Sequence, residues 1–291
     1  MKALGGGSPD ADFVAIGPPQ LLAPLPVTER IEIRLPEAEG TRASNPRAPT
    51  LALPAEIAGR VVRESVEAAV RLARSGEVDA IVTGPADKRA LRAAGIDHPG
   101  HTEWLAALAG GVDVAMMLVA GGLRVVLVTT HLPLREVPAA VTVEQLLTTG
   151  RLALHALEHW WGIDDPRLAL CALNPHAGDG GLFGTEDEEV LRPAAQELNA
   201  AGPFPADTVF VRALRGEFDA VLVPYHDVGM TAVKVVGFGS GVNVTLGLPF
   251  VRTAPDHGTA LDIAGHGTAD PGSMREAIVL AAKLGRLRGG R

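Results

Sequence analysis

Three histidines follow apolar runs that are typical of buried strands. They are His131, His176 and His226, after the runs at 124–130, 167–173 and 218–224. Ligands in open α/β sheets collect at the carboxyl ends of the strands, so we expect these imidazoles to share one edge of a sheet. Neutral imidazole binds zinc, cobalt, nickel or iron, and three such ligands leave coordination positions open for a substrate. The alternative interpretation is three ordinary hydrogen-bonded histidines at strand ends.

A second group of polar residues follows the apolar run at 78–83. The Gly-Pro turn at 83–85 allows backbone atoms to approach a ligand closely, and His101 and Thr102 lie on the next loop. Their side chains can donate hydrogen bonds to phosphate or carboxylate oxygens. The pattern is weak by itself, because Thr102 is equally suited to cap a helix that begins near Glu103.

Two cations and an amide are spaced along the glycine-rich stretch 233–253. They are Lys234, Asn243 and Arg252. Together they suit a substrate that carries both a phosphate and a carboxylate. Spacing by itself favours the simpler interpretation that Lys234 and Arg252 are surface charges.

The segment 256–267 is rich in glycine and other small residues. Such a loop can wrap around a flat ring or a ribose. It does not have the G-x-G-x-x-G pattern, and that pattern follows none of the expected strands. Composition alone therefore does not predict a dinucleotide site here.

Two further groups of polar residues are interpreted structurally. His155 and His159 are one helical turn apart, but no glutamate follows His155 to make an H-E-x-x-H motif, so we expect them on a helix surface. The acidic clusters at 164–165 and 186–189 are expected at helix starts, where the helix dipole favours negative charge.

Alternating strands and helices must position these residues. The apolar runs named above and two more, at 12–16 and 242–246, are the expected strands. The expected helices span 55–74, 143–161, 186–200 and 273–284, with Ser273 and Glu276 spaced as a capping box and 37–49 as a loop. This alternation is typical of an α/β protein with a largely parallel sheet.

The composition limits the class of function. The 291 residues have a net charge of −8, which argues against a general nucleic-acid binder. One cysteine cannot form an intrachain disulfide, no apolar run is long enough to span a bilayer, and residues 1–11 do not have the pattern of a signal peptide. We therefore expect a cytoplasmic enzyme without a membrane or nucleic-acid partner.

Several long segments carry a family pattern. They are VTGPADK (82–88), GIDHPGHTEWLA (95–106), RVVLVTTHLPL (124–134), LNPHAGDGGLFGTE (173–186), GPFPADTVF (202–210), YHDVGM (225–230), VKVVGFGSGVNVTLGLPFVRT (233–253) and DHGTALDIAGHGTADPGS (256–273). In this order they cover the chain from about residue 78 to its end. The chain thereby resembles the 4-hydroxythreonine-4-phosphate dehydrogenase family.

The resemblance implies roles for individual residues. It implies divalent-metal ligands at His131, His176 and His226, and substrate-binding residues at His101, Thr102, Lys234, Asn243 and Arg252. It implies acidic active-site residues at Asp207 and Asp227, and a cofactor loop with His257, Gly258, Thr259, Ala260 and Asp262. The family is a homodimer with the site at the subunit interface, so the third histidine is expected from the partner chain.

The resemblance also implies a two-lobed α/β/α fold similar to isocitrate and isopropylmalate dehydrogenases. One lobe would combine residues 1–105 with 236–291 and carry most of the cofactor site. The middle segment, 106–235, would carry the metal ligands and the dimer contact.

The activity implied is NAD- or NADP-dependent oxidation and decarboxylation of 4-phosphohydroxy-L-threonine to 3-amino-2-oxopropyl phosphate, in vitamin B6 synthesis. A bound divalent metal, such as zinc, cobalt or magnesium, would act as the Lewis acid. The base that removes the hydroxyl proton is Asp227, or Lys234 acting through water, and Asp207 lines the site.

Other functions remain open where the chain departs from the family. The start has no GDPAGIGPE-like loop, so we expect a start codon upstream or a shortened paralogue. Val228 replaces the usual glutamine and Val235 the usual aromatic residue, which leaves D-threonate or D-erythronate 4-phosphate as an alternative substrate. Different classes are a three-histidine zinc hydrolase and a non-catalytic phosphate-binding paralogue.

Overall fold

The protein is seen in a computed structural model that describes residues 11–33, 54–98, 100–264 and 266–289. The expected loop at 37–49 and the question of the chain start at residues 1–10 lie outside the described residues.

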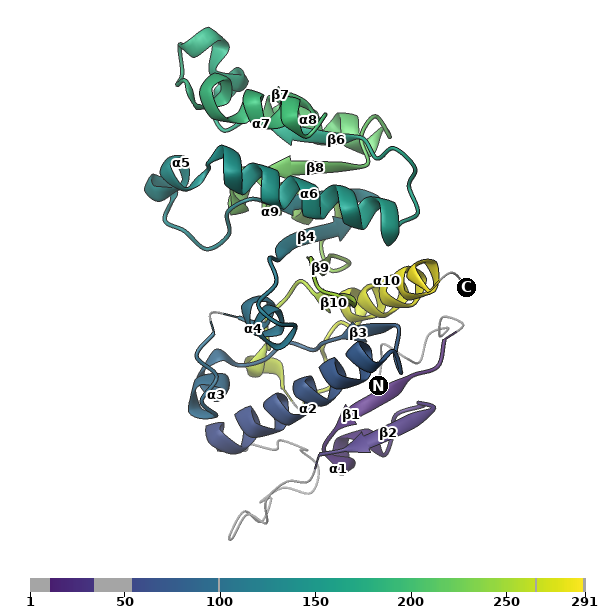
Figure 1. The fold of residues 1–291 in the computed structure, drawn as a ribbon. Coiled ribbons are helices and arrows are strands. Elements are labelled where there is room, and N and C mark those ends of the chain that lie inside the picture. Colours follow the sequence, from purple (N-terminus) through teal and green to yellow (C-terminus); the bar gives the residue numbers. More distant parts are fainter. Residues whose placement is uncertain (1–10, 34–53, 99, 265, 290–291) are drawn as a thin grey trace.

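One eight-stranded sheet runs through the molecule (Figure 1). Its strands, in spatial order, are β3 (Ala80–Val82), β10 (Val251–Pro255), β9 (Val242–Leu246), β4 (Ala115–Ala120), β5 (Leu123–Leu127), β8 (Ala220–Val223), β6 (Leu168–Cys171) and β7 (Ala201–Phe204). A separate parallel pair is formed by β1 (Val14–Gly17) and β2 (Glu29–Glu32). The expected α/β class is therefore confirmed.

The sheet is mixed, so the expectation of a largely parallel sheet is wrong for its centre. Strands β5, β8, β6 and β7 are parallel to one another. In the row β10, β9, β4 and β5, each strand is antiparallel to its neighbour. Strands β4 and β5 form a hairpin through Gly121 and Gly122, whose φ values are 54° and 89°. Two glycines at positive φ match the twist of a tight hairpin, and this hairpin reverses the direction of the sheet.

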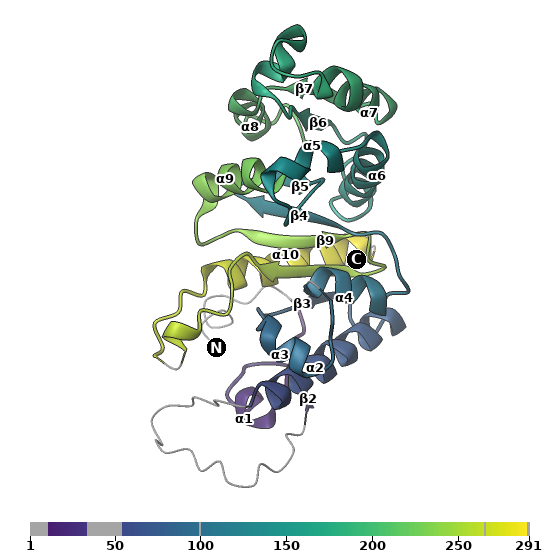
Figure 2. The same cartoon turned by 90° about the vertical axis from the view of Figure 1, so that its left-hand side faces the viewer.

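Helices cover the sheet. They are α1 (Pro19–Leu22), α2 (Ala55–Ser75), α3 (Lys88–Ala93), α4 (His101–Leu108), α5 (Val137–Ala140), α6 (Val143–His159), α7 (Arg192–Glu197), α8 (Ala206–Leu214), α9 (His226–Gly237) and α10 (Gly272–Arg288). Helices α6 and α7 lie on one face of β5, β8 and β6, and α8 and α9 lie on the other (Figure 2). Short helical turns span Leu134–Glu136, Pro175–Gly181, Asp187–Leu191 and Leu261–Ile263.

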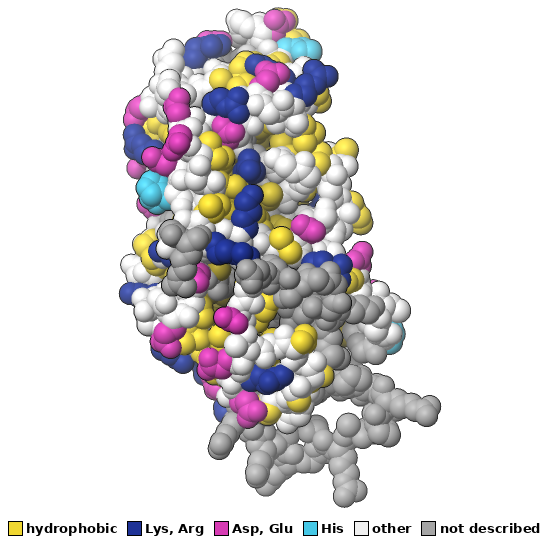
Figure 3. Space-filling view, turned by 90° about the vertical axis from the view of Figure 1, so that its right-hand side faces the viewer, with side chains coloured by type: hydrophobic (Ala, Val, Ile, Leu, Met, Phe, Trp, Pro, Cys, Tyr) yellow, Lys and Arg dark blue, Asp and Glu magenta, His cyan; other side chains and the backbone are white. Residues whose placement is uncertain are grey.

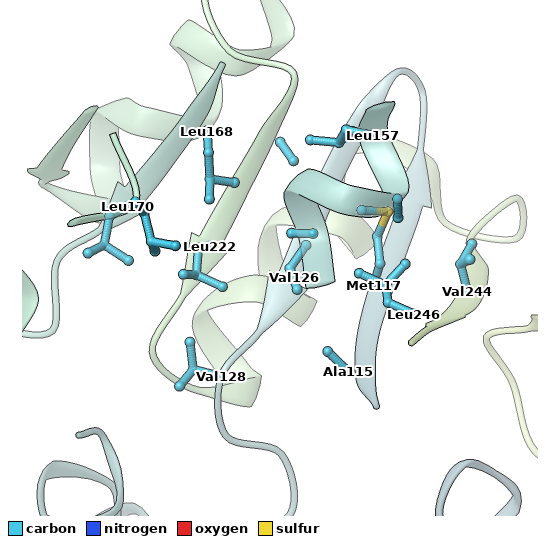
Figure 4. Close-up of a cluster of buried hydrophobic side chains, with 14 of the residues drawn as sticks. Ala115, Met117, Val126, Val128, Leu157, Leu168, Leu170, Leu222, Val244 and Leu246 are labelled. Atoms are coloured by element: carbon cyan, nitrogen blue, oxygen red, sulfur yellow. The ribbon is translucent and has the colours of Figure 1, made fainter. Parts of the chain in front are cut away.

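Strands β4, β8 and β6 are apolar at every position because both faces are covered. In β8, Leu222 contacts the cluster under α6 and α7, while Val221 and Val223 contact the cluster under α8 and α9. Figure 4 shows part of the first cluster, where Leu222 lies with Leu168 and Val126. This packing fixes the strand ends that carry the histidines.

The expected helix at 55–74 is confirmed as α2, and Gly76 ends it in the left-handed conformation at φ 80°. The expected strands are present but mostly shorter, and 242–246 agrees with β9. The expected helix at 186–200 is a single π-helical turn, Asp187–Leu191, that continues into α7. Strands β2, β4, β7 and β10 do not correspond to any strand expected from the sequence.

The expected capping box of the last helix is wrong. Helix α10 begins at Gly272 after Pro271, and no side chain caps it. The Ser273 hydroxyl instead donates to the Gly241 carbonyl oxygen and accepts the Asp256 backbone N–H at 3.1 Å. Ser273 therefore joins three segments beside the predicted cofactor loop.

Candidate active site

His131 and His226 lie side by side because their strands continue to pair beyond β5 and β8. The backbone N–H of Thr129 donates to the Pro224 carbonyl oxygen at 3.2 Å, and the Thr129 hydroxyl donates to the same oxygen at 2.7 Å. The two imidazole centroids are 5.5 Å apart. Two of the three predicted metal ligands are thus brought together within one chain.

The His226 ring is oriented by its neighbour in sequence. His226 is the first residue of α9, and its Nδ1 lies 2.7 Å from Asp227 Oδ1. A carboxylate on Nδ1 leaves Nε2 free, which is the usual arrangement of a metal-ligating histidine. Both rings line a hollow of about 150 Å³, together with Thr130, Leu132, Leu134, Val137, Tyr225 and Asp227.

His176 is placed differently from the other two. It follows β6 and lies exposed on the left-handed turn Pro175–Gly181, with its ring 6.3 Å from that of Phe183. Among the described residues of one chain, no group of three His, Cys, Asp or Glu is placed to hold a metal ion. One chain therefore provides a pair of imidazoles, oriented by a carboxylate, that fits two positions of a metal site.

Arg252 is buried in the sheet, with 3% of its surface exposed, so the surface-charge interpretation is wrong for this residue. From β10 its guanidinium donates to the hydroxyls of Thr245, at 2.9 Å, and Thr83, at 2.6 Å. Burial lowers the pKa of Arg252 to about 10. The ion pairs found among the described residues do not include Arg252, so its charge has no carboxylate partner there.

Two more polar side chains near this arginine have buried atoms without a hydrogen-bond partner in the described structure. They are His101 Nε2 and Asn243 Oδ1, and the Nε of Arg252 is a third such atom. Asn243 shares a face of β9 with Thr245, two residues along, and so lies on the side of the sheet where Arg252 is bound. Burial, and secondarily the charge of Arg252, lowers the pKa of His101 to about 4.

The alternative interpretation of Thr102 as a helix cap is wrong. Helix α4 begins at His101, and Gly100 occupies the cap position without a side-chain bond. The first turn of α4 therefore carries both His101 and Thr102, and His101 lies within electrostatic reach of Arg252.

Lys234, in the last turn of α9, is about one-third exposed and is held by an acidic partner. Its Nζ lies 2.6 Å from Asp256 Oδ2, and that carboxylate is almost completely buried. Asp256 begins the predicted cofactor segment, in which His257, Gly258, Ala260 and Asp262 are exposed and Thr259 is half-buried. The His257 ring nitrogen Nδ1 lies 2.9 Å from the Gly258 carbonyl oxygen.

The predicted acidic residue Asp207 is not joined to the others. It is exposed in the first turn of α8, and the hydrogen bonds and ion pairs of the described residues do not connect it to the site. His155 and His159 are exposed on α6 as expected, with ring centroids 4.1 Å apart.

Sequence reasoning missed two partners that the structure reveals. Thr245 binds Arg252, and Asp256 binds Lys234. A polar residue at every second position of an otherwise apolar strand, as in Asn243 and Thr245, was the available indication for the first. Cations and anions are interspersed with apolar side chains on the face shown in Figure 3. No helix among the described residues is long and apolar enough to cross a membrane.

Known proteins resemble this chain along most of its length. The family model for the pyridoxal phosphate biosynthetic protein PdxA matches residues 27–281. The 4-hydroxythreonine-4-phosphate dehydrogenase of Chromobacterium violaceum is 45% identical over 95% of this chain and 89% of its own length. The enzyme of the same name from Caulobacter vibrioides is 42% identical over 95% and 90%.

Solved structures agree. The crystal structure of 4-hydroxythreonine-4-phosphate dehydrogenase from Klebsiella pneumoniae matches with a TM-score of 0.79 and 35% identity, covering 98% of this chain and 86% of that one. A terephthalate 1,2-cis-dihydrodiol dehydrogenase from Burkholderia xenovorans matches with a TM-score of 0.64 and 30% identity, covering 88% and 80%. From its sequence and its fold, this chain belongs to the PdxA family of pyridoxal phosphate biosynthetic proteins.

Proposed function

We propose that the protein is a metal- and NAD(P)-dependent dehydrogenase that oxidises and decarboxylates 4-phosphohydroxy-L-threonine to 3-amino-2-oxopropyl phosphate in vitamin B6 synthesis. The names of its relatives support the reaction. The observation that carries the proposal is the buried guanidinium of Arg252, which has no carboxylate partner among the described residues and lies with unsatisfied atoms of His101 and Asn243.

An anionic substrate would provide the partners that Arg252, His101 and Asn243 lack among the described residues. A buried charge is costly unless it is paired, and buried polar atoms normally have partners. The phosphate or carboxylate of the substrate would supply acceptors for Arg252, with Thr102 and Lys234 as further donors. Because the pKa of His101 is about 4, this ring is neutral at physiological pH and can donate from one nitrogen to the substrate.

The metal ligands in this proposal are His131, His226 and His176, and a second copy of the chain completes the set across a homodimer interface. The orientation of His226 by Asp227 and the proximity of His131 support two of these positions. A divalent metal bound there supplies a Lewis acid for the substrate hydroxyl. Asp227, or Lys234 through a water molecule, takes the hydroxyl proton.

The nicotinamide cofactor is proposed to bind along the segment with His257, Gly258, Thr259, Ala260 and Asp262. The exposed backbone of this segment and its anchor at Asp256 support the assignment. A nicotinamide cofactor held there would supply the hydride acceptor, and the residues of this segment would position it. The hydrogen bonds and ion pairs of the described residues do not join Asp207 to this site, and we propose that it lines the site from the partner chain.

We propose that the chain forms two lobes, one of residues 1–105 with 236–291 and one of residues 106–235. The boundary would fall between β9 and β4, which are hydrogen-bonded neighbours in one sheet. The two lobes would therefore share a continuous sheet, and the proposed substrate site straddles the boundary, because Lys234 lies in one lobe and Arg252 in the other.

The test is NADH formation by the purified chain with a divalent metal, NAD and 4-phosphohydroxy-L-threonine. D-erythronate 4-phosphate and unphosphorylated 4-hydroxy-L-threonine are the comparison substrates. We expect turnover of the phosphorylated amino acid, lost in His176→Ala and retained in the exposed control His155→Ala. Preference for the sugar acid would reassign the substrate, and no turnover of any of them would contradict the proposal.

A further inference from the structure

The turn that carries His176 has an unusual backbone. All six residues from His176 to Gly181 have positive φ, including the non-glycine residues His176 (53°), Ala177 (56°) and Asp179 (43°). L-residues in this region are strained, and such conformations persist only when the surrounding structure holds them. Something must therefore hold this turn in place.

A buried carboxylate lies at the base of the turn. Asp187 has no exposed surface, its Oδ1 accepts the Leu173 N–H at 2.8 Å, and its Oδ2 accepts the Asn174 N–H at 3.0 Å. These two amides follow strand β6, which ends at Cys171, and lead directly into the turn. The Asn174 side chain is held in turn, because its Nδ2 donates to Glu186 Oε2 at 2.8 Å.

Gly178, in the middle of the turn, also lies against the Asp187 carboxylate. The Phe183 N–H donates to the Gly178 carbonyl oxygen at 3.1 Å. A Cβ added at Gly178 would lie 3.0 Å from the Gly184 carbonyl oxygen and 3.6 Å from Asp187 Oδ2. The turn therefore fits against Asp187 with no room for a larger residue at this point.

The Asp187 carboxylate has no ion-pair partner within 4.0 Å among the described residues, although the charge of Arg192 acts on it from further away. Its oxygens are within bonding distance of backbone N–H groups, and the ion pairs of the described residues do not include Asp187. Burial, and secondarily the charge of Asp187, raises the pKa of the nearby Cys171 thiol to about 12. A carboxylate can accept from both backbone amides at once, whereas an amide side chain has one acceptor oxygen and would leave one of them without its partner.

We propose that Asp187 is a positioning residue for His176, and that Glu186 supports it through Asn174. By fixing two consecutive amides at the end of β6, Asp187 sets the point and direction from which the left-handed turn departs, and so sets where the His176 imidazole lies. The inference rests on the proposed function, in which His176 is a metal ligand.

The test is the affinity of the full-length protein for Co²⁺, measured by calorimetry without substrate. Asp187→Asn keeps the shape but places an amide NH₂ against backbone donors. We expect the Co²⁺ affinity to fall about 10–100-fold, as for other residues that orient a ligand. Glu188→Gln is the control: Glu188 is the next residue, exposed and paired with Arg192, and its variant should bind Co²⁺ as the wild type does.

A double-mutant cycle separates positioning from general support. In the His176→Ala background, Asp187→Asn should cause no further loss of Co²⁺ affinity, because its effect acts through His176. An equal loss in both backgrounds would overturn the proposal. Faster hydrogen exchange of the Leu173 and Asn174 amides in Asp187→Asn is the expected structural signature, and unchanged exchange would also overturn it.

A second variant covers the case in which Asp187→Asn does not fold. Glu186→Ala alters a half-buried side chain and should weaken Co²⁺ binding by a smaller factor, and wild-type affinity would contradict the proposal. The result for His176→Ala tells the two ideas apart. If that variant binds Co²⁺ normally, the metal site itself is wrong; if only the Asp187 and Glu186 variants bind normally, the metal site stands and the positioning role fails.

Discussion

The sequence identifies Arg252 as a cation, but it does not show that this side chain is buried. The spacing of Lys234, Asn243 and Arg252 predicted an anion site, yet it favoured surface charges. Burial of Arg252 depends on β10 lying between β3 and β9, and neither this strand nor its pairing was predicted. Residue types could therefore be predicted from sequence, whereas burial and the Thr83 and Thr245 contacts required the sheet.

The neutral state of His101 predicts a pH dependence of stability. Its pKa is about 4 in the folded protein against 6.5 in the unfolded chain, so the unfolded chain binds the proton more readily. The contribution of the neutral His101 ring to the free energy of unfolding is fully present above pH 6.5 and falls as the pH is lowered towards 4. It amounts to at most about 3 kcal/mol. Urea unfolding of the wild type and His101→Gln from pH 7 to pH 4 measures it. Parallel pH profiles for the two proteins would show that His101 is not held neutral.

The sequence predicts a helix well where apolar residues recur at helical spacing. It predicts a strand poorly where only the pairing with other strands defines it. Helix α2 was evident from its apolar spacing. Strands β4 and β10 lie in stretches where no clear boundary was assigned, although Gly121 and Gly122 between two apolar runs indicate a hairpin. The sheet is mixed because of that hairpin. The alternation of strands and helices along the chain does not show in which direction each strand runs.

The contact between α2 and α3 gives a prediction at this scale. A Cβ at Gly59 would lie 1.8 Å from the Ala90 carbonyl oxygen and 2.8 Å from the Ala94 Cβ, so the two helices would have to separate. We expect Gly59→Ala to lower the free energy of unfolding by about 1–3 kcal/mol, although alanine favours a helix more than glycine does. Urea unfolding is the measurement. Arg60→Ala, at an exposed position of the same helix, should change stability by less than about 0.5 kcal/mol. An unchanged or more stable Gly59→Ala would contradict the close crossing.

At the scale of the whole molecule, the predicted site residues fall into two groups. His131, His226 and Asp227 meet at the ends of β5 and β8. Arg252 on β10, Asn243 on β9 and His101 on α4 form the second group, in which each side chain has a buried atom without a partner among the described residues. Both groups lie along one continuous sheet. The contacts of the described residues do not join His176 or Asp207 to either group. In the proposed homodimer, the place of these two residues in the site would depend on the partner chain, which spacing along one chain does not encode.

We propose that Arg252 is kept buried, without a carboxylate partner among the described residues, in order to bind an anionic substrate. The direct measurement is calorimetric binding of 4-phosphohydroxy-L-threonine to the metal-loaded wild type and to Arg252→Met. We predict that binding weakens about 100-fold or more, because two charge-assisted hydrogen bonds are lost, while stability without substrate changes by only about 1 kcal/mol. Arg124→Met is the matched control, because Arg124 also has a buried Nε without a partner but donates to Asp219 and lies over Trp161. That variant should lose stability and keep wild-type affinity. Wild-type affinity in Arg252→Met would contradict the account.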